Sequence, residues 1–266
     1  MGADTKALRT RIKSVDSTLH LTKAMGLIAS SKIRKANDAM VKGRAYVKSL
    51  DDILQVLTAC PECKKSPYMR NEGDRTRIIV IAGDRGLAGG YNANVFRLAR
   101  EYDGAAFIPI GKRACDRFGK KANSSELFSR ADAYQLAKKQ CEDFTKGAYD
   151  RLGIISTRYV SIMTQEATIR WILPLSPSEK ESSTSAIFEP DESTILETAI
   201  PEYVAGLIAM SVRESFASEV AARRMAMDSA GKNATQMIDD LQLKYNRARQ
   251  SAITQEITEI VAGSGV

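Results

Sequence analysis

The run RIIVIAGDRGLAGGYNANVFRLAR, residues 77–100, decides how the middle of the chain folds. A short run rich in β-branched residues is followed by four glycines within eight residues, and then by apolar residues with helical spacing. A strand, a glycine-rich turn and a helix in this order are typical of α/β proteins, and many such turns bind phosphate. The run therefore predicts an α/β domain and makes a nucleotide site the first possibility to test.

The spacing of the glycines does not match the common phosphate-binding motifs. Gly83, Gly86, Gly89 and Gly90 follow one another in steps of three, three and one. The dinucleotide motif instead requires steps of two and three and an acidic residue after the next strand. A Walker loop requires Lys and then Ser or Thr after its last glycine, whereas Tyr91 follows here. We therefore expect no nucleotide, and a turn that needs positive φ and close approach of the backbone.

The sequence around this run continues the α/β pattern over residues 75–190. Apolar runs predict further strands at 105–111, 158–164 and 167–175. Amphipathic runs predict helices at 93–102, 112–121 and 131–153. Strands that alternate with helices predict a mainly parallel, doubly wound, Rossmann-like sheet.

Residues 1–58 carry a continuous apolar seam with heptad spacing. Thr22 is the only polar residue among fifteen successive a and d positions, and none is charged: Leu8, Ile12, Val15, Leu19, Thr22, Gly26, Ala29, Ile33, Ala36, Met40, Gly43, Val47, Leu50, Leu54 and Leu57. This pattern predicts one long helix paired with another helix. A glycine inside a helix costs about 1 kcal/mol relative to alanine, so we expect the seam glycines to allow close helix approach.

Residues 191–266 predict a second very long helix. Its seam follows the same steps of three and four through Met227, Ala230, Ala234, Ile238, Leu241, Tyr245, Ala248 and Ala252. Two seams at opposite ends of one chain predict an antiparallel coiled coil. The predicted fold is therefore of the α/β class, with a long antiparallel coiled coil of N- and C-terminal helices and a central Rossmann-like α/β domain.

The positive charge of the chain is concentrated at its N-terminus. The formal net charge is +7, while residues 1–48 alone hold eleven Lys or Arg against three Asp. The basic helix predicts an acidic partner: nucleic acid, an anionic membrane surface or an acidic protein collar.

No uninterrupted run of about 18 apolar residues is present, so we expect no membrane-spanning segment. The N-terminus also lacks the apolar core of a signal peptide.

The side chains that usually carry catalysis do not form a recognisable set. His20 is the only histidine and lies in the predicted N-terminal helix, which makes a Ser-His-Asp arrangement improbable. The acidic pairs at 51–52 and 239–240 fall on long helical faces rather than in a cleft. We therefore expect a chain without catalytic residues, metal or cofactor.

The cysteines leave one alternative open. Cys60 and Cys63 have the spacing of half a zinc site or of a redox dithiol. A full zinc site needs two more ligands, and Cys115 and Cys141 are not paired with each other. Ordinary reduced thiols are the simpler interpretation.

Three segments resemble the gamma subunit of F-type ATP synthases over nearly the whole chain. They are RIKSVDSTLHLTKAMGLIASSKIRKA (11–36), GDRGLAGGYN (83–92) and MAMDSAGKNATQMIDDLQLKYNRARQSAITQEITEIVAGSG (225–265). The last is the most specific, and the residues that match its signature are Ile253, Thr254, Glu256, Glu259 and Gly263. Ser264 stands where the family usually has alanine.

The resemblance implies the central rotor shaft of the synthase. In that family the terminal helices form a coiled coil inside a ring of three alpha and three beta subunits, and the α/β domain lies near the epsilon subunit and the membrane ring of c subunits. Rotation driven by ions couples to ATP synthesis at the beta sites, and ATP hydrolysis reverses it. The shaft itself has no active site. A bacterial protein on the cytoplasmic face of the cell membrane is implied, touching the membrane only through the complex.

The resemblance also implies contact residues. Those matching positions that contact the beta subunits are Lys23, Met25, Arg249, Gln250, Thr254 and Glu256. The segment FEP (188–190) matches a region near the c ring, with Glu189 as the polar contact. The family's motifs do not explain the CPEC segment (60–63), and the chain is short for the family.

Two other functions are compatible with single features of the sequence. A basic coiled coil could bind nucleic acid with a steep dependence on salt, but the chain shows no module that reads bases. A small α/β enzyme would need saturable nucleotide binding at the glycine turn, whose spacing argues against it.

Overall fold

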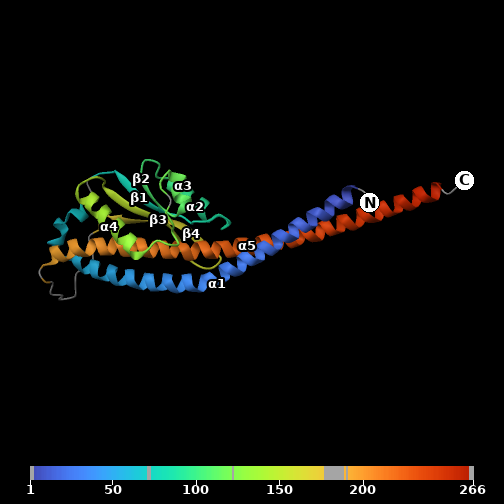
Figure 1. Ribbon diagram of the computed structural model, residues 1–266. Helices are drawn as coiled ribbons and strands as arrows, with labels where there is room; N and C mark the ends of the chain where they lie inside the picture. Colours follow the sequence, from blue (N-terminus) through green and yellow to red (C-terminus); the bar gives the residue numbers. More distant parts are fainter. Residues whose placement is uncertain (1–2, 71–72, 122, 177–188, 190, 264–266) are drawn as a thin grey trace. The chain divides into compact units, whose positions relative to one another are not determined.

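The computed structural model describes residues 3–70, 73–121, 123–176, 189 and 191–263. The elements, in chain order, are α1 (Ala3–Ala59), two 3-10 turns (Cys63–Lys65 and Pro67–Met69), β1 (Thr76–Ile81), α2 (Tyr91–Arg100), β2 (Ala106–Ile110), α3 (Lys112–Phe118), α4 (Arg130–Thr145), β3 (Arg151–Tyr159), β4 (Gln165–Leu173) and α5 (Glu192–Gly263) (Figure 1). The chain divides into two compact units, residues 1–30 with 223–266 and residues 31–222. The predicted domains, 1–58, 75–190 and 191–266, stay a prediction.

The second unit is built on a four-stranded sheet with the order β2-β1-β3-β4. β1 pairs in parallel with both β2 and β3, whereas β4 joins β3 in an antiparallel hairpin. Strands joined through helices make parallel pairs, and strands joined by a tight turn make antiparallel ones. The sheet is thus parallel except for one edge strand, which confirms the predicted α/β class.

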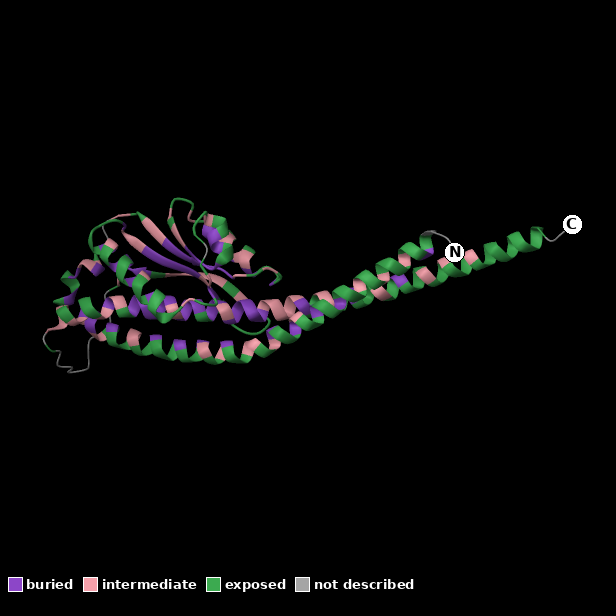
Figure 2. Cartoon of the chain, viewed as in Figure 1, coloured by how far each residue is buried: buried purple, intermediate pink, exposed green. Residues whose placement is uncertain are grey.

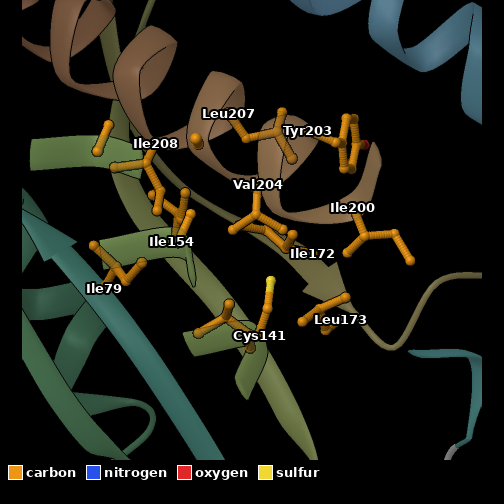
Figure 3. Packing of buried hydrophobic residues seen from close by; sticks show 14 of the residues in the cluster. Ile79, Cys141, Ile154, Ile172, Leu173, Ile200, Tyr203, Val204, Leu207 and Ile208 are labelled. Atoms are coloured by element: carbon orange, nitrogen blue, oxygen red, sulfur yellow. The ribbon is translucent and has the colours of Figure 1, made fainter. Parts of the chain in front are cut away.

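Helices cover both faces of the sheet. Residues along β1 point alternately to the two sides, so each face can be read from the cluster that its residues join. Ile78 and Val80 belong to a cluster with α2 and α3, while Ile79 and Ile81 belong to a larger cluster with α4 and α5. Figure 3 shows this larger cluster, where side chains of α5 such as Val204 meet the strands. The core of the unit therefore lies between the sheet and α5.

The apolar character of α5 follows from this packing. It contains an 18-residue window with mean hydropathy 1.4, enough by length and composition to cross a bilayer, and 56% of that window is buried inside the protein. The window is not an uninterrupted apolar run, because scattered polar residues interrupt it without lowering the mean much, and the expectation of no membrane-spanning segment stays a prediction. Burial on the sheet gives this composition a role within the folded chain.

Side chains of α5 also bond the backbone of β3 where β3 extends past β1. The β1 pairing ends at Ile155, so Thr157 lies beyond the last residue that β1 pairs with. The Thr157 amide donates to Ser215 Oγ (3.1 Å), and Ser218 Oγ donates to the Thr157 carbonyl (3.2 Å). The Tyr159 amide donates to Glu214 (3.1 Å). Buried polar residues of the helix thus replace a strand partner.

The predicted seams pair in antiparallel fashion within each unit. A Cβ on Gly26 would lie 3.6 Å from Met227 Cβ in the first unit, and one on Gly43 would lie 3.5 Å from Met210 in the second. Every predicted seam position of α1 is buried or half-buried (Figure 2). This confirms the predicted pairing of the terminal helices.

Two predicted boundaries were wrong. The helix predicted at 131–153 ends at Thr145, because Gly147 adopts a left-handed conformation (φ 69°) and β3 begins at Arg151. The strand predicted at 158–164 is the end of β3 followed by a hairpin turn. An apolar turn looks like a strand in sequence, since both are short apolar runs.

Candidate partner-binding surfaces

The glycine turn between β1 and α2 is occupied by a carboxylate of the chain itself. A Cβ on Gly83 would lie 2.6 Å from the carboxyl carbon of Glu219, which is buried on α5. The Gly83 amide donates to Asn92 Oδ1 (2.9 Å). A negative side chain here repels phosphate. The predicted close approach is thus found at Gly83, and the predicted positive φ at Gly89 (56°).

Asp84 ties the glycine turn to two other segments. Its carboxylate accepts hydrogen bonds from the backbone amides of Lys112 (3.0 Å), Ser125 (2.9 Å) and Glu126 (3.2 Å), and from the Ser124 hydroxyl. Burial favours a higher pKa for Asp84, but these four hydrogen bonds outweigh it and lower the pKa below its usual value. The negative charge of Asp84 therefore holds the three segments together.

This arrangement displays two large apolar side chains. Leu87 is 64% exposed and has positive φ (60°), which is uncommon for a residue with a branched side chain. Leu127 is 80% exposed, directly after the residues bound by Asp84. Neither was predicted from the sequence, although an apolar residue among four glycines is a signal from which exposure at a turn could have been predicted.

The beta-contact residues implied by the resemblance lie on the two long helices. Lys23 is exposed and Met25 is half-buried on α1. The four on α5 are all exposed: Arg249, Gln250, Thr254 and Glu256. Glu189 is exposed in a bend, while its neighbours Phe188 and Pro190 lie outside the described residues. The structure thus leaves these positions accessible, and their contacts stay a prediction.

The cysteines are free thiols. Burial, aided by nearby acids, raises the pKa of Cys63 to about 11, and burial raises that of Cys141 to about 12. Cys60 is half-buried, and its pKa is also raised. A raised pKa keeps the thiol protonated at neutral pH and lowers its reactivity.

Within the described ranges no three His, Cys, Asp or Glu side chains are grouped so that they could hold a metal ion. His20 lies 3.7 Å from Asp16 on α1.

Comparisons with a family model and with individual proteins point to the same family. The family model described as ATP synthase matches residues 4–265. The ATP synthase gamma chain of Ruminococcus albus is 39% identical, with 98% of each chain covered. This chain belongs to the ATP synthase gamma-chain family. A further member, the gamma chain of Acetobacterium woodii described as sodium ion specific, is 36% identical over 99% of each chain.

Solved structures share the fold of this family member. A chain of the Euglena gracilis mitochondrial ATP synthase, solved with F1 and the c ring, aligns with a TM-score of 0.68 at 19% identity and covers all of this chain. A chain from the central stalk and c ring of the Tetrahymena thermophila synthase aligns with a TM-score of 0.60 and covers 79%. The paired terminal helices and the central sheet are therefore the gamma-chain fold.

Proposed function

We propose that this chain is the central rotor shaft of an F-type ATP synthase and has no active site of its own. Ion-driven rotation of the c ring turns the shaft, and the shaft takes the catalytic sites of the ring of alpha and beta subunits through their states. ATP hydrolysis drives the reverse rotation. The observation that carries the proposal is the match with gamma chains along almost the full length of both sequences.

The long helices suit this role. α5 continues without interruption from the second compact unit into the first, as a helix of 72 residues. None of its described residues after Leu241 is buried, and Figure 2 shows the exposed last turns. A long helix end whose described residues are at most half-buried is stabilised when a partner surrounds it. A ring of three alpha and three beta subunits is the partner we propose.

The proposed contacts follow the exposed positions. Lys23, Met25 and the exposed residues of α5 would face the beta subunits, and Glu189 would face the c ring. Exposed ion pairs contribute only about 0–1 kcal/mol, so contacts of this kind hold the shaft without fixing one angle. The epsilon subunit would bind beside the α/β part. Nucleic acid is not among the proposed partners.

The proposed location is the cytoplasmic face of a bacterial cell membrane. The chain would be peripheral there and would touch the membrane only through the assembled complex. The apolar segment of α5 does not conflict with this, since more than half of its most hydrophobic window is already buried.

Co-expression with the matching alpha and beta subunits tests the proposal. We expect a particle of three alpha, three beta and one copy of this chain by native mass, with ATP hydrolysis only when the chain is present. Alpha and beta subunits that fold and associate without taking up this chain would contradict it. The control is the same co-expression without this chain.

A further inference from the structure

The hairpin between β3 and β4 exposes an apolar tip. Met163 is 77% exposed, Val160 50% and Ile162 40%, within four consecutive residues. Exposed apolar side chains are common singly, but a cluster of them marks an interaction site. The hydrogen bonds of the turn involve the backbone and polar side chains. The three exposed apolar side chains therefore remain available to a partner.

The tip is held rigidly in spite of its exposure. The Ser161 amide donates to the Thr164 carbonyl (3.0 Å), and the Met163 amide donates to Ser161 Oγ (3.2 Å). Gln165 Nε2 donates to the carbonyls of Ser161 (3.0 Å) and Ile162 (2.7 Å). A pre-ordered loop loses less conformational entropy on binding. The apolar side chains are thus presented on a fixed turn.

A hollow of about 490 Å³ lies directly beside the tip. Val160 belongs to both, and the buried residues Val47 and Met210 contribute further apolar surface to the hollow. Four cations line it, Arg44, Lys48, Arg158 and Arg170, against two carboxylates, Asp51 and Glu214. Apolar surface surrounded by positive charge suits an apolar side chain flanked by carboxylates.

The ion pairs at the hollow leave part of this positive charge available. Glu214 pairs with Arg44, and Asp51 pairs with Arg170 (3.3 Å). In the part of the chain that the structure describes, Lys48 makes no ion pair, and Arg158 pairs with Glu166 outside the hollow (2.9 Å). Three of the four cations are therefore paired with carboxylates, and the positive charge left available at the hollow is that of Lys48.

We infer that the hairpin tip and this hollow form one docking surface for an acidic segment of a partner protein. The segment carries one large apolar side chain, which enters the hollow, and a carboxylate beside it, which faces Lys48. A second copy of this chain would bring the same positive charge and be repelled. A nucleic-acid backbone would satisfy the charge but would leave Met163 and Ile162 against phosphates.

The inference rests on the proposed function only in that the partner is sought in the assembled synthase. The chain is prepared with the photo-crosslinking residue benzoylphenylalanine in place of Met163 and assembled with the matching alpha, beta and epsilon subunits. Because the Met163 side chain is mostly exposed, this change leaves the core intact. After irradiation, mass spectrometry identifies the linked peptide. The same residue at Tyr134, 40% exposed on α4, is the matched control.

We expect one main product from position 163, a peptide with Asp or Glu beside a large apolar residue. Lys48→Glu should lower the yield of that product by roughly tenfold, because it places like charges together. Lys138→Glu, an exposed charge reversal on α4, should leave the yield unchanged.

The outcomes separate this inference from the proposed function. If the assembly forms and hydrolyses ATP but position 163 gives no product, the docking surface is wrong and the rotor role stands. A product without carboxylates, or a yield that Lys48→Glu does not change, also overturns it. If the unmodified chain never joins the assembly, the proposed function itself fails.

Discussion

At the scale of single residues, Gly111 makes the closest approach to another backbone among the described glycines. It follows β2 with φ at 96°, and a Cβ there would lie 2.0 Å from the Ala82 carbonyl oxygen. We expect Gly111→Ala to lower the free energy of unfolding by about 3 kcal/mol or more, since strain and overlap add. Gly119 is the control: its φ is also positive (63°), but no atom of the described residues lies within 4 Å of its Cβ position.

Gly119→Ala should cost only about 1–2 kcal/mol, the strain of the left-handed conformation alone. Denaturant unfolding of the two variants of the full chain measures the difference. Equal losses would show that the Ala82 carbonyl moves away freely and that the close approach has no energetic weight.

Asp84 makes stability depend on pH. Its pKa is lowered in the folded chain, so its contribution is present above the unfolded value of about 3.9 and is lost as the pH falls through the folded pKa. Asp84→Asn should lower the free energy of unfolding at pH 7 by about 1–3 kcal/mol. The gap between variant and parent should narrow from pH 5 to pH 3. Asp103→Asn, at an exposed position, should show neither effect.

Arg249 tests the contacts proposed for the shaft. Arg249→Glu in the assembled enzyme should lower ATP hydrolysis severalfold if a partner carboxylate faces it, because like charges then meet. Arg247 is also exposed but lies two residues earlier, about 200° around the helix. Arg247→Glu should leave the rate nearly unchanged. Equal effects of the two variants would mean that the charge of the helix matters rather than a contact at position 249.

At the scale of elements, the junction of β3 with α5 depends on two buried hydroxyls. Ser215→Ala removes the acceptor of the Thr157 amide, and Ser218→Ala removes the donor to the Thr157 carbonyl. Each should cost about 1–3 kcal/mol, because a buried backbone group is left unpaired. Hydrogen exchange at the Thr157 amide distinguishes them, since only Ser215→Ala frees that amide. Unchanged exchange in Ser215→Ala would contradict the bond.

The elements differ in how far their sequences determined them. The seams of α1 and α5 could be predicted because heptad spacing sustained over many turns is produced by few structures besides paired helices. The β3–β4 hairpin could not, because Val160, Ile162 and Met163 have the composition of a strand and only the partner strand fixes where the turn falls. The pairing of α5 side chains with Thr157 needs contacts between residues about 60 positions apart, which no local pattern contains.

The glycines of the two long helices differ in what surrounds them. A Cβ on Gly206, which lies outside the predicted seams, would meet Leu50 at 3.0 Å and Tyr46 at 3.1 Å, so close approach does require a small residue there. At Gly26 the nearest atom would be 3.6 Å away, an ordinary contact. The helices are thus in contact at Gly26, but the space there would also admit an alanine. Sequence spacing alone cannot tell these two situations apart.

At the scale of the whole molecule, the last turns of α5 should change most on assembly. No described residue after Leu241 is buried, so amides of 249–263 should exchange rapidly in the isolated chain. Enclosure by alpha and beta subunits should slow them by about tenfold or more. Amides of β1 and β3 serve as the internal control and should be slow in both states. Slow exchange at 249–263 in the isolated chain would show that this helix end needs no partner.

The candidate binding surfaces differ in whether their residues could be predicted from the sequence. The residues proposed to contact the beta subunits came from a family resemblance, since exposed Lys23 and Arg249 look like any solvated charge on a helix. The hairpin tip and its hollow had no such precedent. They depend on α1, the β3–β4 turn and α5 meeting around one cavity, which only the folded second unit brings together.

The packing of α5 on the sheet also bears on how the chain is made. All four strands lie between residues 76 and 173, and the buried apolar residues of α5 come after them, from Leu196 to Val212. Because a ribosome releases the N-terminal part first, the surface that receives this apolar segment is synthesised before the segment itself. The order of the elements along the chain thus lets the apolar segment of α5 pack on its sheet as soon as it is made. A circular permutant that begins with α5 would expose this segment until the strands had been synthesised.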